Sequence, residues 1–260
     1  MASEDGIRIK KKYGQHFLKD LWVVDEIVSS VKLDDNSSVF EIGGGAGFLT
    51  KGILLAKLAR LWVFEIDEEW VEHLNKTIED PRLRVFHQNI LDLDFKVFEA
   101  DKLWTLLANL PYVVTFPILY LLQRNIHLLK EGVIMVQEEV AQKILKSYGK
   151  DYGYVSLFFQ HYFEWKMLSK IPPAAFNPPP KVFSRLLYFK PNISRVTIPD
   201  EEGFWKFIKV CFKQPRRTLR NNLLQSQYDI TNFTEDMLKL RAQQMSFNDL
   251  LAIWVGLPKK

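Results

Sequence analysis

Four consecutive residues carry the clearest chemical signal in this chain of 260 residues: Asn109, Leu110, Pro111 and Tyr112. A carboxamide can hydrogen-bond the amino edge of a nucleobase, and an aromatic ring can stack on its face, so the tetrad suits a flat heteroaromatic substrate. The proline between them is rigid. Because Asn-x-Pro also forms ordinary turns, the tetrad alone is weak evidence for a base-binding site. The segments before it strengthen that prediction.

A glycine-rich loop precedes the tetrad. Residues 39–42 form an apolar, β-type run that ends in Gly43, Gly45 and Gly47, and a helical pattern follows. Glycines let the backbone turn sharply and approach a ligand closely. The spacing differs from the dinucleotide motif, since the third glycine comes one residue early and Glu41 precedes the first. A carboxylate there repels a pyrophosphate but can help hold the cationic amino-acid end of S-adenosylmethionine.

Two further segments would complete such a cofactor site. Glu65 and Ile66 end the next predicted strand, where an acid commonly accepts both ribose hydroxyls. After the third strand, Asn89 can hydrogen-bond the adenine amine while Ile90 packs on the adenine face. A tight turn without a ligand is the alternative for the glycines, and the combination with Glu65 and the tetrad argues against it.

The tetrad predicts chemistry at an exocyclic amine. The amine of adenine is a poor nucleophile, because its lone pair is delocalised into the ring. The side-chain oxygen of Asn109 and the backbone carbonyl of Leu110 would accept its two hydrogens and draw the nitrogen toward tetrahedral geometry. Tyr112 would stack the base in line with the sulfonium methyl group. This chemistry requires neither a strong base nor a metal.

The two aromatic candidates each have a structural alternative. Phe176 precedes three prolines at 178–180 and can close the other face of the base, or the segment is only a stiff loop. Tyr112 can instead be a buried core aromatic.

Alternating strand and helix patterns predict an α/β fold. Strands are expected at 39–42, 61–66, 83–86, 103–108 and 132–137, and helices at 49–59, 68–78, 117–129 and 138–147. This alternation favours a doubly wound, Rossmann-like sheet covered on both faces. Together with the cofactor residues above, it leads us to expect a methyltransferase sheet. Aromatic-rich segments at 155–166 and 182–189 are predicted to add an antiparallel edge.

Strand patterns stop at about residue 191. Helices are expected at 203–212, 217–226, 234–241 and 246–254, with Ser246 as N-cap of the last and Asp249 at the capping-box position. We therefore predict a methyltransferase domain over 1–190 and a small, all-helical RNA- or substrate-binding domain over 191–260.

Composition argues against disulfide-rich, metal-binding and membrane-spanning classes of protein. The hydrophobic content of 47% allows a real core, and the single cysteine, Cys211, excludes an internal disulfide framework. No Cys/His set has metal-ligand spacing, so no metal is expected. No run approaches the roughly 20 apolar residues of a membrane span, and the acidic start lacks the apolar region of a signal peptide. We expect a cytoplasmic monomer.

Basic residues gather in clusters, although the net charge is only +4. The candidates for RNA contact are Lys10, Lys11, Lys12, Lys181, Lys213, Arg216, Arg217 and Arg220. The last four have near-helical spacing and would form one basic face, so binding through phosphates should weaken steeply with salt. The alternative is a solvated basic surface without a partner.

In order and spacing, these segments resemble the small-subunit ribosomal RNA adenine dimethyltransferases, the bacterial kasugamycin-sensitivity family. The resemblance extends from about residue 10 to 254, and its most specific segments are 13–18, 41–45, 65–67, 109–112, 152–156, 176–184 and 212–221. It implies transfer of two methyl groups from S-adenosylmethionine to N6 of each of two adjacent adenines, in a 3′-terminal hairpin of the small-subunit RNA on a pre-30S particle.

The same resemblance implies residue roles. His16 and Leu18 would border the cofactor, Gly43 and Glu65 would hold its amino-acid and ribose parts, and Asn109 would lie between cofactor and base.

Three positions depart from the family pattern. Asn89 replaces the usual acid after the third strand, but its amide oxygen can still accept a hydrogen bond. Val113 stands where Asn often follows the tetrad, and Ala108 where Gly usually precedes it. Neither of these two changes removes a proposed acceptor.

Other functions stay open at this point. A large-subunit methylase that confers macrolide resistance is similar, but segment 214–221 and the helical tail favour the small-subunit enzymes. A non-catalytic RNA-binding assembly factor would not need the intact tetrad. A DNA adenine methylase would need a base-reading domain, which the sequence does not show.

Overall fold

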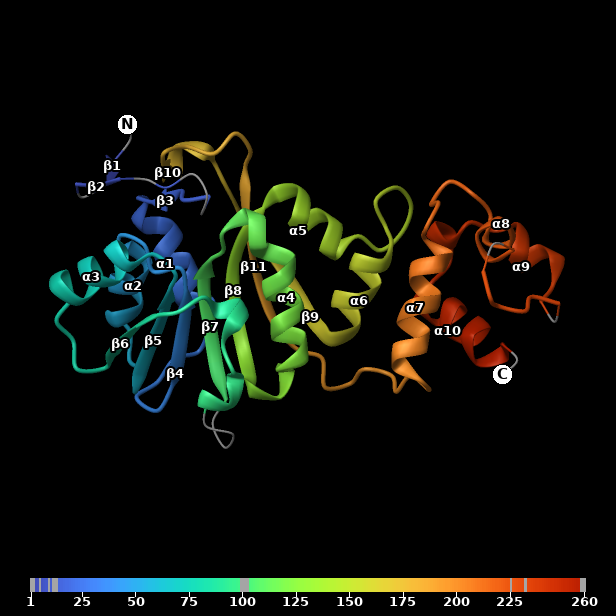
Figure 1. Ribbon diagram of the computed structural model, residues 1–260, viewed down its shortest axis with the longest axis horizontal. Coiled ribbons are helices and arrows are strands. Elements are labelled where there is room, and N and C mark those ends of the chain that lie inside the picture. Colours follow the sequence, from blue (N-terminus) through green and yellow to red (C-terminus); the bar gives the residue numbers. More distant parts are fainter. Residues whose placement is uncertain are drawn as a thin grey trace. The chain divides into compact units, whose positions relative to one another are not determined.

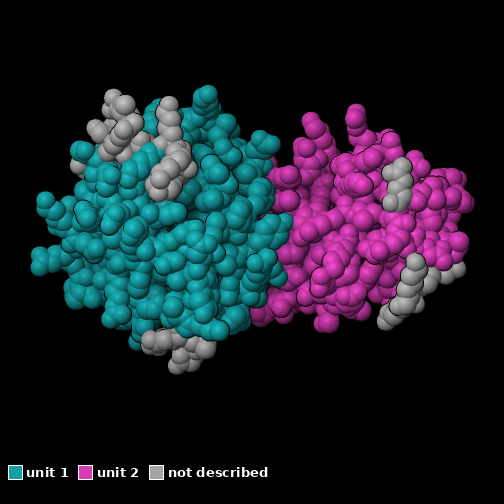
Figure 2. All heavy atoms as spheres, viewed as in Figure 1, with its two compact units in different colours: residues 1–141, 164–191 teal, residues 142–163, 192–260 magenta. Residues whose placement is uncertain are grey.

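The computed structural model describes residues 3–4, 6–8, 10, 14–98, 103–224, 226–231 and 233–257. The chain forms two compact units, shown in separate colours in Figure 2. The first contains residues 1–141 and 164–191, and the second contains 142–163 and 192–260. The second unit begins its main part at the predicted boundary near 191. It also includes 142–163, which the sequence predictions assign to the first domain.

A seven-stranded sheet forms the centre of the first unit, in the order β6-β5-β4-β7-β8-β11-β9 (Figure 1). Its parallel strands are β4 (Ser38–Ile42), β5 (Arg60–Glu65), β6 (Leu83–His87), β7 (Trp104–Asn109) and β8 (Leu129–Gln137). β11 (Ser184–Pro191) pairs antiparallel with β8, and β9 (Phe163–Ile171) follows at the edge. The predicted parallel strands and the antiparallel edge are confirmed.

The strand order reverses at β4. After β4 the chain continues through β5 and β6 on one side and then through β7 and β8 on the other. All five residues of β4 are buried, as expected for a central parallel strand covered on both faces. A reversal of this kind leaves a crevice at the carboxyl ends of the strands.

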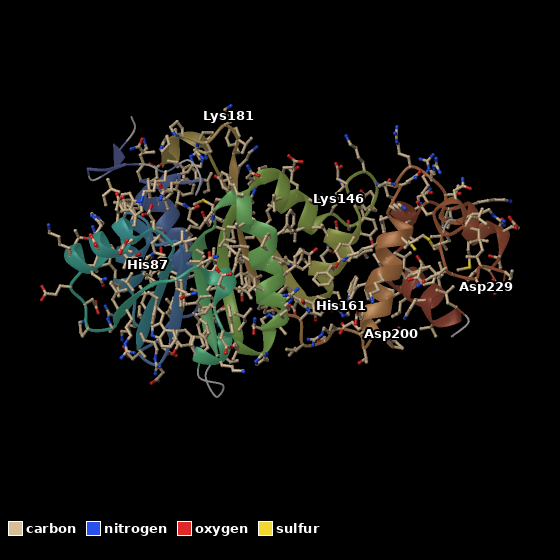
Figure 3. All side chains as sticks on the ribbon, in the orientation of Figure 1. His87, Lys146, His161, Lys181, Asp200 and Asp229 are labelled. Carbon is tan, nitrogen blue, oxygen red and sulfur yellow. The ribbon has the colours of Figure 1, made fainter. Side chains whose placement is uncertain are left out.

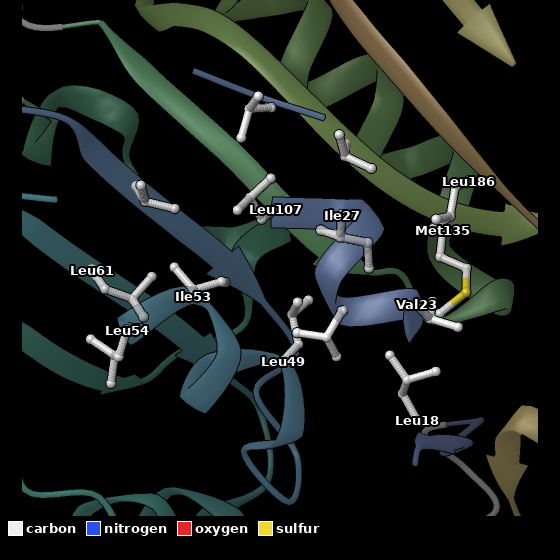
Figure 4. Packing of buried hydrophobic residues seen from close by; sticks show 14 of the residues in the cluster. Leu18, Val23, Ile27, Leu49, Ile53, Leu54, Leu61, Leu107, Met135 and Leu186 are labelled. Carbon is white, nitrogen blue, oxygen red and sulfur yellow. The ribbon is translucent and has the colours of Figure 1, made fainter. Parts of the chain in front are cut away.

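Helices of the first unit follow the predicted pattern with shifted ends. They are α1 (Leu21–Ser29), α2 (Phe48–Leu54), α3 (Glu68–Thr77), α4 (Thr115–Arg124) and α5 (Glu138–Leu145), the last of which extends past the first unit's boundary at 141. The helix-like periodicity of residues 25–31 corresponds to α1. Apolar residues of α1 and α2, among them Ile27 and Ile53, pack with Leu107, Met135 and Leu186 of the sheet (Figure 4). This burial holds the glycine-rich loop before α2 against the sheet.

Short elements complete the first unit. The 3₁₀ helices are η2 (Ile90–Asp92), η3 (Phe95–Val97), η4 (Tyr112–Val114), η5 (Ile126–Leu128) and η6 (Pro173–Ala175). β1 (Ser3–Glu4) pairs with β2 (Ile7–Arg8), and β3 (Phe17–Leu18) pairs antiparallel with β10 (Phe176–Asn177). The second of these pairs joins two segments far apart in the sequence.

The strand predicted at 155–166 is wrong over residues 155–162 and correct from Phe163 on. Residues Tyr154–Tyr162 form helix α6, and β9 begins only at Phe163. Phe158 and Tyr162, four residues apart on one helix face, pack on Trp205 of the second unit at ring-centroid distances of 4.9 and 6.0 Å. Burial of aromatic rings in this helical unit outweighs their preference for strands.

The remaining helices of the second unit are α7 (Glu201–Cys211), α8 (Leu219–Leu223), α9 (Glu235–Lys239) and α10 (Phe247–Gly256), with the 3₁₀ helix η7 (Ala242–Gln244). All four helices predicted after residue 191 are confirmed, although α8 and α9 are shorter than expected. The capping box is also confirmed, because Ser246 accepts from the Asp249 backbone N–H and Asp249 accepts from that of Ser246.

Candidate active site

A cavity of about 230 Å³ opens in the first unit at the carboxyl ends of β4, β5, β6 and β7. Its walls come from residues 14–18, 41–46, 64–66, 88–91 and 109–114, with three residues of the adjoining helices. The predicted site residues that line it are His16, Leu18, Gly43, Gly45, Glu65, Ile66, Asn89, Ile90, Asn109, Leu110, Pro111 and Tyr112. The structure therefore brings the predicted cofactor and reacting sites into one cavity.

Glycine is required in the loop after β4. Gly43 and Gly45 have φ angles of +80° and +47°, in the left-handed region that side chains rarely adopt. A Cβ atom on Gly45 would lie 2.7 Å from Cε1 of Phe17, closer than any normal contact. The loop therefore presents bare backbone to the cavity.

Glu65 joins the glycine loop to the end of β5. One carboxylate oxygen accepts from the Gly45 backbone N–H at 2.9 Å, and the other accepts from the Asp67 N–H at 2.9 Å. Burial raises the pKa of this carboxyl, and the backbone hydrogen bonds oppose that shift. The carboxylate keeps acceptor capacity for a hydroxyl donor beyond these backbone contacts.

Glu41 is a second buried carboxyl on the same cavity. It is 1% exposed, and its Oε2 accepts from the Thr50 hydroxyl at 2.7 Å. Burial raises its pKa to about 8, the Thr50 hydrogen bond opposes the shift, and the charge of Glu65 adds to it. Two adjacent carboxyls with little water favour a ligand that brings a positive charge.

The amide of Asn109 has a defined orientation. Its Nδ2 donates to the backbone carbonyl of His16 at 3.1 Å, and no described residue donates to Oδ1. Oδ1 is therefore the end of the amide that accepts from a ligand. The Leu110 backbone N–H donates to the Met135 carbonyl at 3.2 Å, which joins the tetrad to β8.

Tyr112 is held at its ring and at its hydroxyl. Its ring lies 5.7 Å from the His16 ring at an angle of 27°, and its hydroxyl is 2.6 Å from that of Ser184. Burial raises the pKa of the phenol, so the ring stays neutral. His16 Nδ1 lies 2.8 Å from the carbonyl of Pro178, so this nitrogen carries the hydrogen.

A family profile described as "Ribosomal RNA adenine dimethylase" matches residues 6–249. The chain belongs to this family. It is 34% identical over 249 residues to "Ribosomal RNA small subunit methyltransferase A" of Chlorobium phaeobacteroides, covering 95% of this chain and 91% of the relative. The protein of the same name from Syntrophotalea carbinolica is 38% identical over 218 residues, covering 83% and 82%.

The fold also agrees with a solved structure. A dimethyladenosine transferase from Plasmodium falciparum superposes with a TM-score of 0.78 at 23% identity, covering 92% of this chain and 96% of that one. Membership of the dimethylase family makes this chain an S-adenosylmethionine-dependent methyltransferase.

Asn89 is the position where this dimethylase lacks the usual acid of the family, and its side chain contacts a neighbouring acid. Asn89 Nδ2 donates to the carboxylate of Asp92 at 2.7 Å, and its Oδ1 accepts from the Leu91 backbone N–H at 3.2 Å. The amide is thus oriented with its oxygen as the acceptor. Sequence reasoning missed Asp92, although its spacing of three residues from Asn89 is the usual distance across one turn.

The structure does not bring Phe176 to the cavity. The ring is 1% exposed and belongs to the core cluster with Leu18 and Ile171. The pairing of β10 with β3 places it there, opposite Leu18. Its expected stacking on the target base therefore has no support from this arrangement. Cavity residues that the prediction omitted include Gln15, Phe17 and Gln88.

Lys10 near the N-terminus, which was predicted to contact RNA, is paired within the protein. Lys10 Nζ pairs with Asp67 at 2.6 Å and with Glu69 at 3.0 Å, and these carboxylates raise its pKa. Its charge is thus neutralised within the protein. Lys11 and Lys12 lie outside the described residues. Lys181 is exposed on the loop between β10 and β11 (Figure 3).

The basic cluster of the second unit does not form one helix face. Lys213, Arg216 and Arg217 are exposed on the loop between α7 and α8. Helix α8 starts only at Leu219, because Thr218 caps its N-terminus. Arg220 lies in that helix and pairs with Glu235 of α9.

The described part of the chain contains no candidate metal site and no candidate membrane span. No group of three or more His, Cys, Asp or Glu side chains in this part of the chain is placed to hold a metal ion. None of its helices combines the length and apolar character that crossing a bilayer requires.

Proposed function

We propose that the protein transfers methyl groups to N6 of two adjacent adenines in the 3′-terminal hairpin of small-subunit (16S) ribosomal RNA. The products are N6,N6-dimethyladenosines, formed in the cytoplasm during ribosome biogenesis. The observation that carries this proposal is the oriented amide of Asn109, which presents an acceptor to the cavity beside the ring of Tyr112.

The cavity suits S-adenosylmethionine. When bound, the cofactor supplies an electrophilic methyl group on a positively charged sulfur. Glu41 and the backbone at Gly43 and Gly45 would hold its amino-acid end, and Glu65 would accept from the ribose hydroxyls. The adenine end would meet the oriented amide of Asn89. The residues that would border the ligand are His16, Leu18, Ile66 and Ile90.

The tetrad acts on the target base. Oδ1 of Asn109 and the carbonyl of Leu110 accept the two hydrogens of the adenine amine, which localises the nitrogen lone pair toward the methyl donor. Pro111 has a φ of −60° and holds that backbone in place. Tyr112 stacks on the base, and its hydrogen bond to Ser184 limits rotation of the ring.

RNA contact is assigned mainly to the helical domain, residues 191–260. The exposed cations Lys213, Arg216 and Arg217 would contact phosphates, with Arg220 and Lys181 adding to them. We propose that the substrate is a pre-30S particle and that the enzyme acts on it as a monomer.

The alternatives are less well supported. A structure of the 23S rRNA methyltransferase ErmE superposes with a TM-score of 0.66 at 21% identity, which shows a shared fold only. The relatives of 34–38% identity are named for the small subunit. A non-catalytic assembly factor would not need the oriented amide of Asn109.

The test uses radiolabelled S-adenosylmethionine with immature small subunits, mature small subunits and large subunits. Each of two neighbouring adenines in the small-subunit RNA should gain two methyl groups, as mapped by primer extension and mass spectrometry. Label confined to large-subunit RNA, or none with any particle, would refute the proposal.

A further inference from the structure

An exposed aromatic residue precedes, in the chain, the serine that holds the hydroxyl of the proposed base-stacking ring. The hydroxyl of Ser184 is 2.6 Å from that of Tyr112, and the preceding residue, Phe183, is 45% exposed. Val182 before it is 44% exposed. Grouped exposed apolar side chains near a ligand site are a common mark of an interaction surface.

The backbone under this ring is fixed. The carbonyl of Phe183 accepts from the Glu138 backbone N–H at 3.0 Å, and Ser184 pairs with Gln137 in the β11–β8 ladder. Ser184 is fully buried. Because successive side chains of a strand point to opposite sides, burial of Ser184 leaves the Phe183 ring in solvent at a defined place.

Two lysines accompany the ring. Lys170 of β9 has its Nζ 4.3 Å from the centroid of the Phe183 ring, and Lys181 is two residues before it in the chain. Both lysines are exposed, and within the described part of the chain neither forms an ion pair. An aromatic face with adjacent cations is the usual combination for binding single-stranded nucleic acid.

We propose that Phe183, Lys170 and Lys181 form a binding site for the unpaired nucleotide next to the target adenine. Phe183 would stack on the flanking base, and the lysines would neutralise its phosphate. This site rests on the proposed function, because it requires the target adenine to enter beside Tyr112. It would hold the neighbouring nucleotide while one adenine occupies the cavity.

The first test measures affinity for immature small subunits and the steady-state kinetics of methylation. Phe183→Ala should weaken particle binding by about fivefold or more, the loss that follows removal of one base–aromatic stack. KM for the particle should rise, while kcat and the affinity for S-adenosylmethionine stay unchanged. Phe183→Trp should restore binding. Leu55→Ala, at a site on the same unit that is 90% exposed, is the control and should match the unmodified protein.

The second test identifies what the ring contacts. A photoreactive phenylalanine analogue at position 183 should crosslink to RNA beside the methylated adenines, as mapped by reverse transcription. Crosslinks to a ribosomal protein or to distant RNA would overturn the inference, and so would a yield no higher than that of the same analogue at position 55. Normal particle binding by Phe183→Ala would also overturn it.

The two proposals can fail separately. If the unmodified protein does not methylate adjacent adenines in small-subunit RNA, the proposed function fails. If it does so and Phe183→Ala binds the particle normally, only the flanking-nucleotide site fails.

Discussion

Two asparagine amides in the cavity are oriented in the same way, by a hydrogen bond from the amide nitrogen. Each gives its nitrogen to a protein acceptor, the His16 carbonyl for Asn109 and the Asp92 carboxylate for Asn89, so that its oxygen serves as the acceptor for a ligand amine. An amide that is free to flip would offer a donor and an acceptor equally. The orientation therefore allows each oxygen to accept a hydrogen from a ligand amino group.

Asn109→Ala should lower the rate of methyl transfer by about a hundredfold or more, comparable to removing one oriented group that stabilises a transition state. Binding to the immature particle should stay close to normal, because the exposed cations are untouched. Single-turnover incorporation of labelled methyl groups measures the first effect, and particle co-sedimentation measures the second. Near-normal turnover would remove Asn109 from the reaction.

Asp92→Ala should weaken the affinity for S-adenosylmethionine by roughly threefold to tenfold, the usual loss when one side-chain hydrogen bond is removed. The reason is that Asn89 would no longer be held with its oxygen outward. Asp94→Ala is the matched control, because Asp94 is a nearby exposed acid that accepts from the Lys96 backbone N–H instead of from Asn89. Calorimetric titration measures the affinity for S-adenosylmethionine. Equal losses of affinity in both variants would contradict the proposal that Asp92 positions Asn89.

The buried Glu41 predicts how stability depends on pH. Its pKa is raised to about 8, so between about pH 4.5 and pH 8 the folded state binds more protons than the unfolded state. The free energy of unfolding should therefore fall as pH rises through this window. Glu41→Gln keeps the shape of the side chain and should flatten this part of the profile. Urea unfolding from pH 5 to 8.5 measures it, and parallel profiles would refute the assignment.

At the scale of elements, the sequence predicted the sheet well because its strands are short apolar runs between helices of clear period. The cofactor and reacting residues followed, since Ile42, Glu65 and Asn109 each end a parallel strand. Pairing between distant segments was not predictable. The β3–β10 pair buries Phe176, and Ser184 reaches Tyr112 only through the β11–β8 register.

The glycine loop yields a prediction at this scale. Gly45→Ala should destabilise the fold by roughly 1–3 kcal/mol or more, because the φ of +47° is strained for alanine and its Cβ would clash with Phe17. Gly149→Ala is the control, since Gly149 also has a positive φ but nothing lies within 4 Å of its Cβ. Thermal unfolding should show a larger loss of stability for Gly45→Ala than for Gly149→Ala. Equal losses would show that the contact with Phe17 does not matter.

For the molecule as a whole, RNA binding should depend more on where the positive charges lie than on the net charge of +4. Lys10 is neutralised by Asp67 and Glu69, so one predicted RNA contact is engaged within the protein. Among the described residues, no acid forms an ion pair with the exposed cations of the α7–α8 loop, Arg216 and Arg217 among them. Affinity for the phosphate backbone should therefore depend on this loop.

Reversing the charge of both Arg216 and Arg217 to glutamate should flatten the salt dependence of particle binding. Two lost phosphate contacts would lower the slope of log K against log salt concentration by roughly 1.5, because each contact releases most of one counterion. The control reverses two exposed lysines of the first unit, Lys51 and Lys76, and changes net charge equally. Equal flattening in both variants would mean that net charge governs binding, and an unchanged slope in the arginine variant would exclude this loop from the RNA interface.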